Sequence, residues 1–163
     1  MRKIESMTIT LAIAMTCLAI ATAAIAQSRN PPAGPYEPGL GDLMTTTVQP
    51  RHIKIALAAR EKNWAYAAYE FNELNEAFGR AVQVWPLWQS KPIKDMLASV
   101  MKQPMSDLGQ AIKAQDATKF AAAYDQLTSG CNACHQAAGR GMVVIKKPDA
   151  SSYPDQDFSP VKP

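Results

Sequence analysis

Cysteine and histidine, the side chains that most often bind zinc, are scarce in this chain. The 163 residues contain three Cys and two His. A structural zinc site normally takes four such ligands, usually as two pairs. Cys131, Cys134 and His135 lie together, but apart from Cys17 the only further ligand of this kind is His52. This shortage argues against a zinc site.

Long hydrophobic runs are also rare. The longest covers residues 7–25, follows the basic start Met1-Arg2-Lys3 and ends at the small-x-small sequence Ala24-Ile25-Ala26. A membrane-spanning helix needs about 20 apolar residues, whereas this arrangement is typical of a cleaved export signal. A lipoprotein signal at Cys17 is disfavoured by the residues before it. We predict that residues 1–26 are a signal peptide, that the protein is periplasmic, and that no membrane anchor remains.

Charge of neither sign is in large excess. The chain has 17 basic and 14 acidic residues, a net charge of +3. Without Arg2, Lys3 and Glu5 of the signal peptide, 15 basic and 13 acidic residues remain, a net charge of +2. Nucleic-acid binding depends on a concentrated positive surface. We therefore expect no nucleic acid as a partner.

Proline and glycine concentrate at the two ends of the exported chain. Residues 27–41 are rich in both, which predicts an extended lead-in. Four prolines interrupt residues 142–163, which predicts a non-helical, proline-rich tail. The tail aromatics Tyr153 and Phe158 suggest that part of it packs on the domain. Residues 42–141 between these segments have the length of one domain and show no strand signal.

The first half of this domain carries two helical patterns. Asp42 is a candidate N-cap of the first helix. Pro50 either kinks that helix or begins a new one after a short turn at 42–47. The second helix is predicted over about 62–85, where apolar residues recur at helical spacing. Its opposite face is predicted to be polar and to carry Glu70, Glu73, Glu76 and Arg80.

The second half carries two more. A third helix opens with Pro92 at its first turn and is predicted to be kinked or split at Pro104. A fourth begins after the cap Asp116 and stops at Gly139. Four amphipathic helices with short connections predict an all-α fold, an antiparallel four-helix bundle. Three tryptophans are predicted to serve only as packing: Trp64, Trp85 and Trp88.

A five-residue motif lies near the end of the fourth helix: Cys131-Asn132-Ala133-Cys134-His135. Cys-x-x-Cys-His is the attachment signature of a c-type haem. Two thiols three positions apart on a helical turn can each add to one haem vinyl group, and the adjacent histidine becomes an axial iron ligand. A redox-active Cys-x-x-Cys would need a preceding strand, which is not predicted here. We predict one covalently attached haem c, bound by Cys131, Cys134 and His135.

The position of this motif resembles that in the class II c-type cytochromes, the cytochrome c′ and cytochrome c-556 group. The resemblance implies a four-helix bundle with the haem attached to the C-terminal helix. The chain is also similar to small proteobacterial haem proteins that carry an Arg-His-x-Lys stretch, an Asn-Trp stretch and a Cys-Asn-x-Cys-His motif, here residues 51–54, 63–64 and 131–135. It departs from cytochromes c′ at Ala138 and Gly139, where that group has an aromatic and a basic residue.

The second axial position of the iron separates the possible functions. In an up-down-up-down bundle, the end of the fourth helix lies beside the beginnings of the first and third. This brings Met44, His52 and Met96 to the haem. Met44 has the placement of the distal methionine in c-556-like proteins. We therefore predict His135 as the proximal ligand and Met44 as the distal ligand, with His52 or a vacant position as the alternatives.

With both axial positions filled, such a protein carries single electrons and is not an enzyme. One alternative is a cytochrome c′-like binder of nitric oxide or carbon monoxide at a five-coordinate haem. Another is an enzyme with peroxidase-like or nitric-oxide-consuming chemistry, aided by Arg51 or His52. The expected partner is a redox protein, and the oligomeric state is left open, a homodimer included. Five cations are predicted to form a basic rim that attracts an acidic partner: Lys91, Lys94, Arg140, Lys146 and Lys147.

Overall fold

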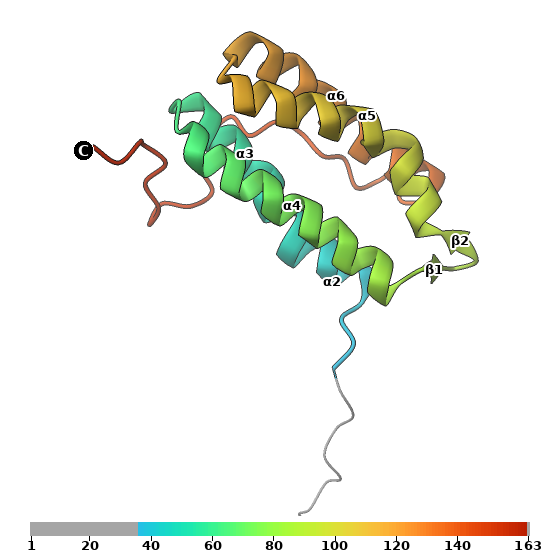
Figure 1. Ribbon diagram of the computed structural model, residues 1–163. Coiled ribbons are helices and arrows are strands. Elements are labelled where there is room, and N and C mark those ends of the chain that lie inside the picture. The colour runs from blue at the N-terminus through green and yellow to red at the C-terminus, as the bar shows by residue number, and fades with distance from the viewer. Residues whose placement is uncertain (1–35, 163) are drawn as a thin grey trace, which may run out of the picture. The chain divides into compact units, whose positions relative to one another are not determined.

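The protein is described by a computed structural model that covers residues 36–162. The predicted signal peptide (1–26) and most of the predicted lead-in (27–41) lie outside the described residues. The remainder is mostly helical, which confirms the prediction of an all-α fold (Figure 1). None of the described helices is both long and apolar enough to cross a membrane. The elements are α2 (Leu40–Leu43), η1 (Met44–Val48), α3 (Gln49–Arg60), α4 (Trp64–Val84), β1 (Leu87–Trp88), β2 (Lys91–Pro92), α5 (Ile93–Ala114) and α6 (Ala117–Ala137).

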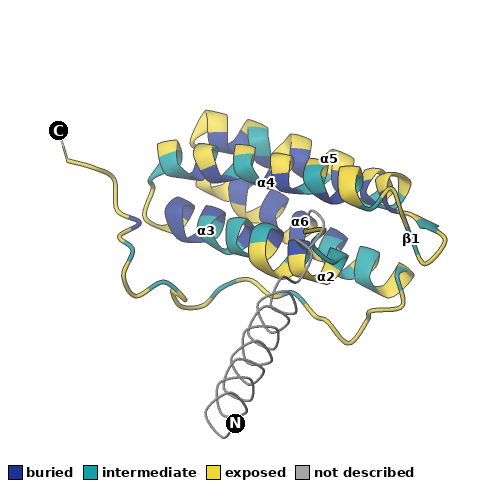
Figure 2. Ribbon diagram, turned by 90° about the horizontal axis from the view of Figure 1, so that it is seen from below, coloured by how far each residue is buried: buried dark blue, intermediate teal, exposed yellow. Residues whose placement is uncertain are grey.

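The helices pack in two consecutive pairs. Helix α3 lies along α4, and α5 lies along α6; the pairs meet mainly through α4 and α5 (Figure 1). The connections are short, so the helices of each pair are antiparallel. Their buried faces turn toward one another, as Figure 2 shows. The largest fully buried apolar side chains come from all four helices: Ile55, Leu57, Leu74, Leu108 and Leu127.

The first helical segment is continuous from Leu40 to Arg60, so the predicted turn at 42–47 is wrong, although Pro50 does lie in the first turn of α3, as that alternative predicted. The other alternative, a kink at Pro50, stays a prediction. In place of the predicted turn, the chain passes through η1, a π-helical turn in which the Gln49 N–H donates to the Met44 carbonyl. Pro50 has no N–H to donate, and the wider turn accommodates it. Nearby carbonyls accept hydrogen bonds from the hydroxyl groups of Thr45, Thr46 and Thr47.

Asp42 is not the N-cap that the sequence predicted. The helix begins at Leu40, with Gly39 as its N-cap. The Asp42 carboxylate accepts a hydrogen bond from the Gly39 N–H at 3.1 Å. The carboxylate still satisfies a backbone N–H at the start of the helix, where a negative charge is favourable.

Helix α4 follows its predicted apolar stripe but not its predicted polar face. Ala67, Leu74 and Ala81 are buried, as predicted. Glu70, predicted on the polar face, is only 1 % exposed. Its carboxylate lies 3.0 Å from the guanidinium of Arg51, which also reaches Glu73 at 3.3 Å. The sequence pattern within α4 could not show this burial, because the partner that makes it tolerable comes from α3.

Between α4 and α5 the chain makes a two-stranded hairpin that the sequence did not predict. Strand β1 pairs with β2, and the turn residues Gln89 and Ser90 have φ angles of 49° and 63°. Hairpin turns of this kind normally use Asn or Gly, which tolerate positive φ. Because this turn contains neither Asn nor Gly, no pattern in the sequence predicted a hairpin here.

Helix α5 continues through Pro104, so the predicted split is wrong, while the predicted kink stays a prediction. Proline cannot donate to the carbonyl four residues earlier, here that of Val100. The Val100 oxygen faces α6 at Gly130, where an added Cβ would lie only 2.8 Å away. Glycine therefore lets α6 approach α5 closely, directly before the Cys-x-x-Cys-His motif.

Both predicted ends of α6 are confirmed. The Asp116 side chain accepts hydrogen bonds from the N–H groups of Thr118 and Lys119. Gly139 has a φ of 73°, a left-handed conformation that glycine adopts without strain. The Gly139 N–H donates to the Gln136 carbonyl and the Arg140 N–H to the His135 carbonyl, which is a Schellman motif.

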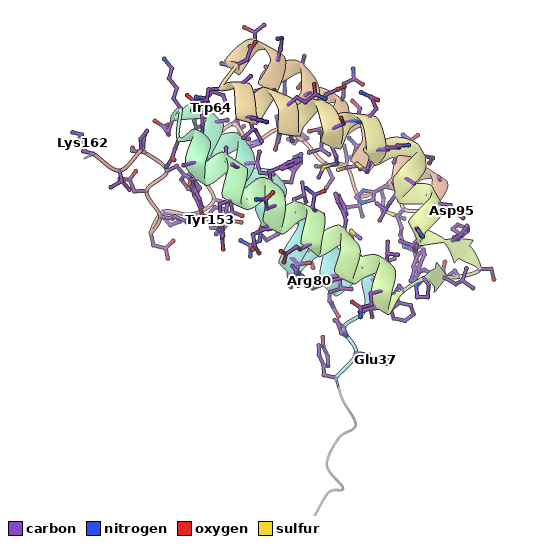
Figure 3. All side chains as sticks on the ribbon, viewed as in Figure 1. Glu37, Trp64, Arg80, Asp95, Tyr153 and Lys162 are labelled. Atoms are coloured by element: carbon purple, nitrogen blue, oxygen red, sulfur yellow. The ribbon has the colours of Figure 1, made fainter. Side chains whose placement is uncertain are left out.

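Residues 138–162 form the non-helical tail, and the prediction that its aromatics pack on the domain is confirmed. Phe158 is buried and stacks on Tyr66 of α4 at 5.7 Å between ring centroids. Tyr153 lies beside the α3–α4 pair (Figure 3), with the Lys54 ammonium 4.7 Å from its ring. These two aromatic side chains therefore anchor the tail on the α3–α4 pair.

Candidate functional site

An apolar cavity of about 330 Å³ lies where η1, the start of α5 and the end of α6 come together. Its volume falls in the range of about 300–1,000 Å³ that is usual for cofactor and ligand sites. It brings together all the residues predicted to hold the haem and its axial ligands except Met96: Cys131, Cys134, His135, Met44 and His52. The rest of its lining is mostly apolar and includes Val48, Phe78, Trp88, Ile93, Leu97, Met101, Val143 and Ile145.

The two motif cysteines occupy the last two turns of α6 and are partly buried against the core. Both are free thiols. Burial raises the pKa of Cys131 to about 12 and raises the pKa of Cys134 as well. Reactive and redox-active cysteines have lowered pKa values, so this environment does not suit a redox disulfide. Within residues 36–162, no three Cys, His, Asp or Glu side chains are grouped so that they could hold a metal ion.

One ring nitrogen of His135 is engaged in a hydrogen bond, and the other is available to bind a metal. Its Nδ1 lies 2.8 Å from the carbonyl oxygen of Val143 in the tail. A carbonyl oxygen can only accept, so Nδ1 carries the proton and donates it. In the neutral ring Nε2 then holds a free lone pair, the form in which histidine binds metals.

Met44 is the predicted distal ligand that lines the cavity, as the first residue of the π-helical turn η1. Turns of this type are frequently found at functional sites. Met96, the weakest of the predicted candidates, is not among the lining residues. Met101 is a lining residue that sequence reasoning missed, although Ile93, Leu97 and Met101 recur every four residues on α5.

His52 also lines the cavity, but both of its ring nitrogens are hydrogen-bonded inside the core, where the residue is only 3 % exposed. Nε2 lies 3.0 Å from Thr128 Oγ1, and Nδ1 lies 3.0 Å from the Tyr124 hydroxyl. Thr128 donates its own proton to the Tyr124 carbonyl, so His52 Nε2 donates to Thr128. Binding iron through His52 would require one of these bonds to break. The geometry therefore favours Met44 over His52.

Burial lowers the pKa of His52 to about 4 from its usual 6.5, which predicts a specific pH dependence of stability. Between these values the unfolded chain binds a proton at His52 that the folded chain does not, so stability falls as the pH falls. The expected loss from pH 7 to pH 4 is about 3 kcal/mol. Urea unfolding of the native protein and of His52→Gln at several pH values measures it, because the variant lacks this contribution.

Tyr124→Phe is the matched control for that measurement. It removes a hydroxyl that contacts His52 but keeps the imidazole, so it should lower stability by about 1–3 kcal/mol while retaining a decline toward pH 4. An identical decline in the native protein and in His52→Gln would contradict the assignment to His52.

The predicted basic rim is only partly assembled at the cavity. Arg140 lines the cavity, and its guanidinium lies 4.7 Å from the ring of Trp88. Lys91 pairs with Trp88 in the hairpin, and Lys94 lies in the first turn of α5. Lys147 forms an ion pair with Asp125 at 2.7 Å. Asp125 lies ten residues before His135, about 15 Å along the helix. The tail residue Lys147 therefore lies beside the middle of α6, away from the cavity.

The tail contributes lining residues that sequence reasoning did not assign to the site. Val143 and Ile145 line the cavity, and Asn132 of the motif holds Ile145. The resemblance to proteins with Cys-Asn-x-Cys-His marked Asn132, but the sequence assigned it no role. Trp88, predicted as packing alone, also lines the cavity.

Comparison with known proteins found no matching family model, no similar curated protein and no similar solved structure.

Proposed function

We propose that this protein is a monohaem c-type cytochrome that carries single electrons in the periplasm. The observation that carries the proposal is the cavity, because two thiols, an imidazole with a free Nε2 lone pair and a thioether line the same apolar space. In the sequence these four residues form two distant groups, with Met44 near the start of the domain and the other three within residues 131–135 near its end. Apolar packing alone does not require this combination of side chains.

The side chains present fit a covalently attached haem. Cys131 and Cys134 would hold the porphyrin through two thioether bonds, each made by adding a thiol S–H across one haem vinyl group. His135 would bind the iron through Nε2, and Met44 would supply a second ligand through its thioether sulfur. A bound haem supplies an iron that gains and loses one electron. The chain itself would enclose that group in an apolar site and supply the side chains that bind its iron.

The architecture supports the same proposal. The two helix pairs α3–α4 and α5–α6 are what an antiparallel four-helix bundle of the class II cytochrome c type requires. In such bundles, cofactors bind between facing helices. The export signal predicted in residues 1–26 would direct the chain to the compartment where c-type haem is attached.

The partner is proposed to be a redox protein with an acidic face. Arg140, Lys91 and Lys94 belong to the segments that surround the cavity, and positive charge there would attract such a partner. Lys147 is not part of this surface because Asp125 pairs with it. Electron transfer needs no further substrate site, so the protein is proposed not to be an enzyme.

Two measurements test the proposal. The intact mass of the protein, produced in a host that matures c-type cytochromes, should exceed that of the cleaved chain by one haem. Absorption spectra of both oxidation states should be those of a low-spin iron and should not change with carbon monoxide. A mass without haem, or a haem that acidic acetone extracts, would refute the proposal. A high-spin spectrum that responds to carbon monoxide would favour the gas-binding alternative.

A further inference from the structure

The tail segment that follows α6 is folded back onto the Cys-x-x-Cys-His motif. The left-handed residue Gly139 reverses the chain, and the Val143 N–H donates to the Arg140 carbonyl at 2.9 Å. The reversal brings the Val143 carbonyl to His135 Nδ1. The tail then runs antiparallel to α6, since Ile145 contacts Asn132 and Lys147 contacts Asp125.

Asn132 holds this segment with two hydrogen bonds of opposite sense. Its Nδ2 donates to the Ile145 carbonyl at 3.0 Å, and its Oδ1 accepts from the Ile145 N–H at 2.8 Å. A side-chain amide is suited to this role because it offers a donor and an acceptor side by side. The paired bonds fix the backbone of residues 143–145 relative to the helical turn that carries His135.

We propose that Asn132 is a positioning residue for the proposed iron ligand, acting on His135 through the tail carbonyl of Val143. The proposal rests on the function proposed above. A histidine ligand is oriented, and made more electron-rich, by the group that accepts its second N–H. Here that group is a backbone carbonyl on a non-helical tail, which would otherwise be free to move away. Asn132 keeps it within hydrogen-bonding distance, so Nδ1 stays protonated and Nε2 keeps its lone pair.

The expected consequence is on the reduction potential. A hydrogen bond from Nδ1–H strengthens electron donation by the ring and therefore stabilises oxidised iron relative to reduced iron. Losing the two Asn132 hydrogen bonds to Ile145 should change the equilibrium ratio of oxidised to reduced iron on the order of tenfold. For a one-electron couple this corresponds to a rise of about 59 mV.

The test compares the haem-loaded native protein with Asn132→Leu, which has a similar size but no polar atoms. The variant should show a higher reduction potential and faster hydrogen exchange at the Ile145 amide. Asn132→Asp keeps an acceptor for that amide but loses the donor, so both effects should be smaller. Gln126→Ala, at an exposed position of the same helix, should change neither quantity.

A second control separates positioning from general loss of stability. Phe158→Ala removes a buried anchor of the far half of the tail. It should lower the melting temperature but leave the potential unchanged, because Asn132 still holds residues 143–145. Faster exchange in Asn132→Leu without a change in potential would overturn this proposal alone, and so would an equal change in Phe158→Ala. A native protein without covalent haem would instead overturn the proposed function, and this proposal with it.

Discussion

Replacing Cys131 and Cys134 together by alanine is expected to give a protein with no covalent haem and with greatly reduced stability. Both proposed thioether bonds would be lost, so the intact mass should fall to that of the polypeptide. The apolar cavity of about 330 Å³ would remain empty. An unfilled cavity of this size costs several kcal/mol, at most about 8 kcal/mol. This is comparable with the whole stability of a domain, about 5–15 kcal/mol.

Mass spectrometry and thermal melting followed by far-ultraviolet circular dichroism measure the two parts of this prediction. The melting temperature should fall by tens of degrees or the transition should lose its cooperativity. Cys17→Ala in the full-length precursor is the matched control, because Cys17 lies in the predicted signal peptide and its loss should change neither result. A double variant that retains the haem mass would refute the attachment site. One that melts like the native protein would show that the cofactor does not fill the cavity.

Replacing Met44 by alanine is expected to convert a low-spin iron that does not bind carbon monoxide into a high-spin iron that binds it. The thioether of Met44 would be the ligand lost, and alanine is too short to replace it. The native oxidised protein should show the weak near-infrared band of methionine-to-iron charge transfer, and the variant should lack it. Thioether ligation raises the reduction potential relative to bis-histidine ligation, so the native potential should be correspondingly high.

Three further variants identify the ligand by exclusion. His52→Ala should leave the spectrum unchanged, because His52 is engaged by Tyr124 and Thr128. Met101→Leu and Met96→Ala should also leave it unchanged. If His52→Ala gives the high-spin protein instead, the ligand is His52 and the potential should be low. If the native protein is already high-spin and binds carbon monoxide, the gas-binding function replaces electron transfer.

Much of the helical structure followed from local sequence signals. The ends of α6 are set by the carboxylate of Asp116 and the left-handed residue Gly139, and both are decided by the residues within one turn. The apolar stripes of α4 and α6 follow from the 3.6-residue period. The covalent chemistry of Cys-x-x-Cys-His is equally local, so the predicted haem site depended on five adjacent residues.

Other features were decided only when distant segments came together. Glu70 is buried because Arg51 of α3 lies beside it, and no pattern within α4 contains that information. The π-helical segment Met44–Val48 takes the place of the turn predicted at 42–47, because the chain can widen the helix instead of breaking it. His52 is occupied by Tyr124 and Thr128, which are more than 70 residues away in the sequence.

The environment of His135 shows the same division. The motif predicts the histidine as a ligand, but it does not say which atom accepts its Nδ1 proton. That atom belongs to Val143, on a tail whose composition predicts only irregular backbone. Asn132 holds the tail through Ile145, a role that the motif does not reveal. Sequence alone determined the helices and the candidate ligands, because helix capping, periodicity and the attachment motif act over a few residues. The tertiary structure decided which candidates share a cavity and which are already hydrogen-bonded, because these properties depend on distances between segments that are remote in the chain.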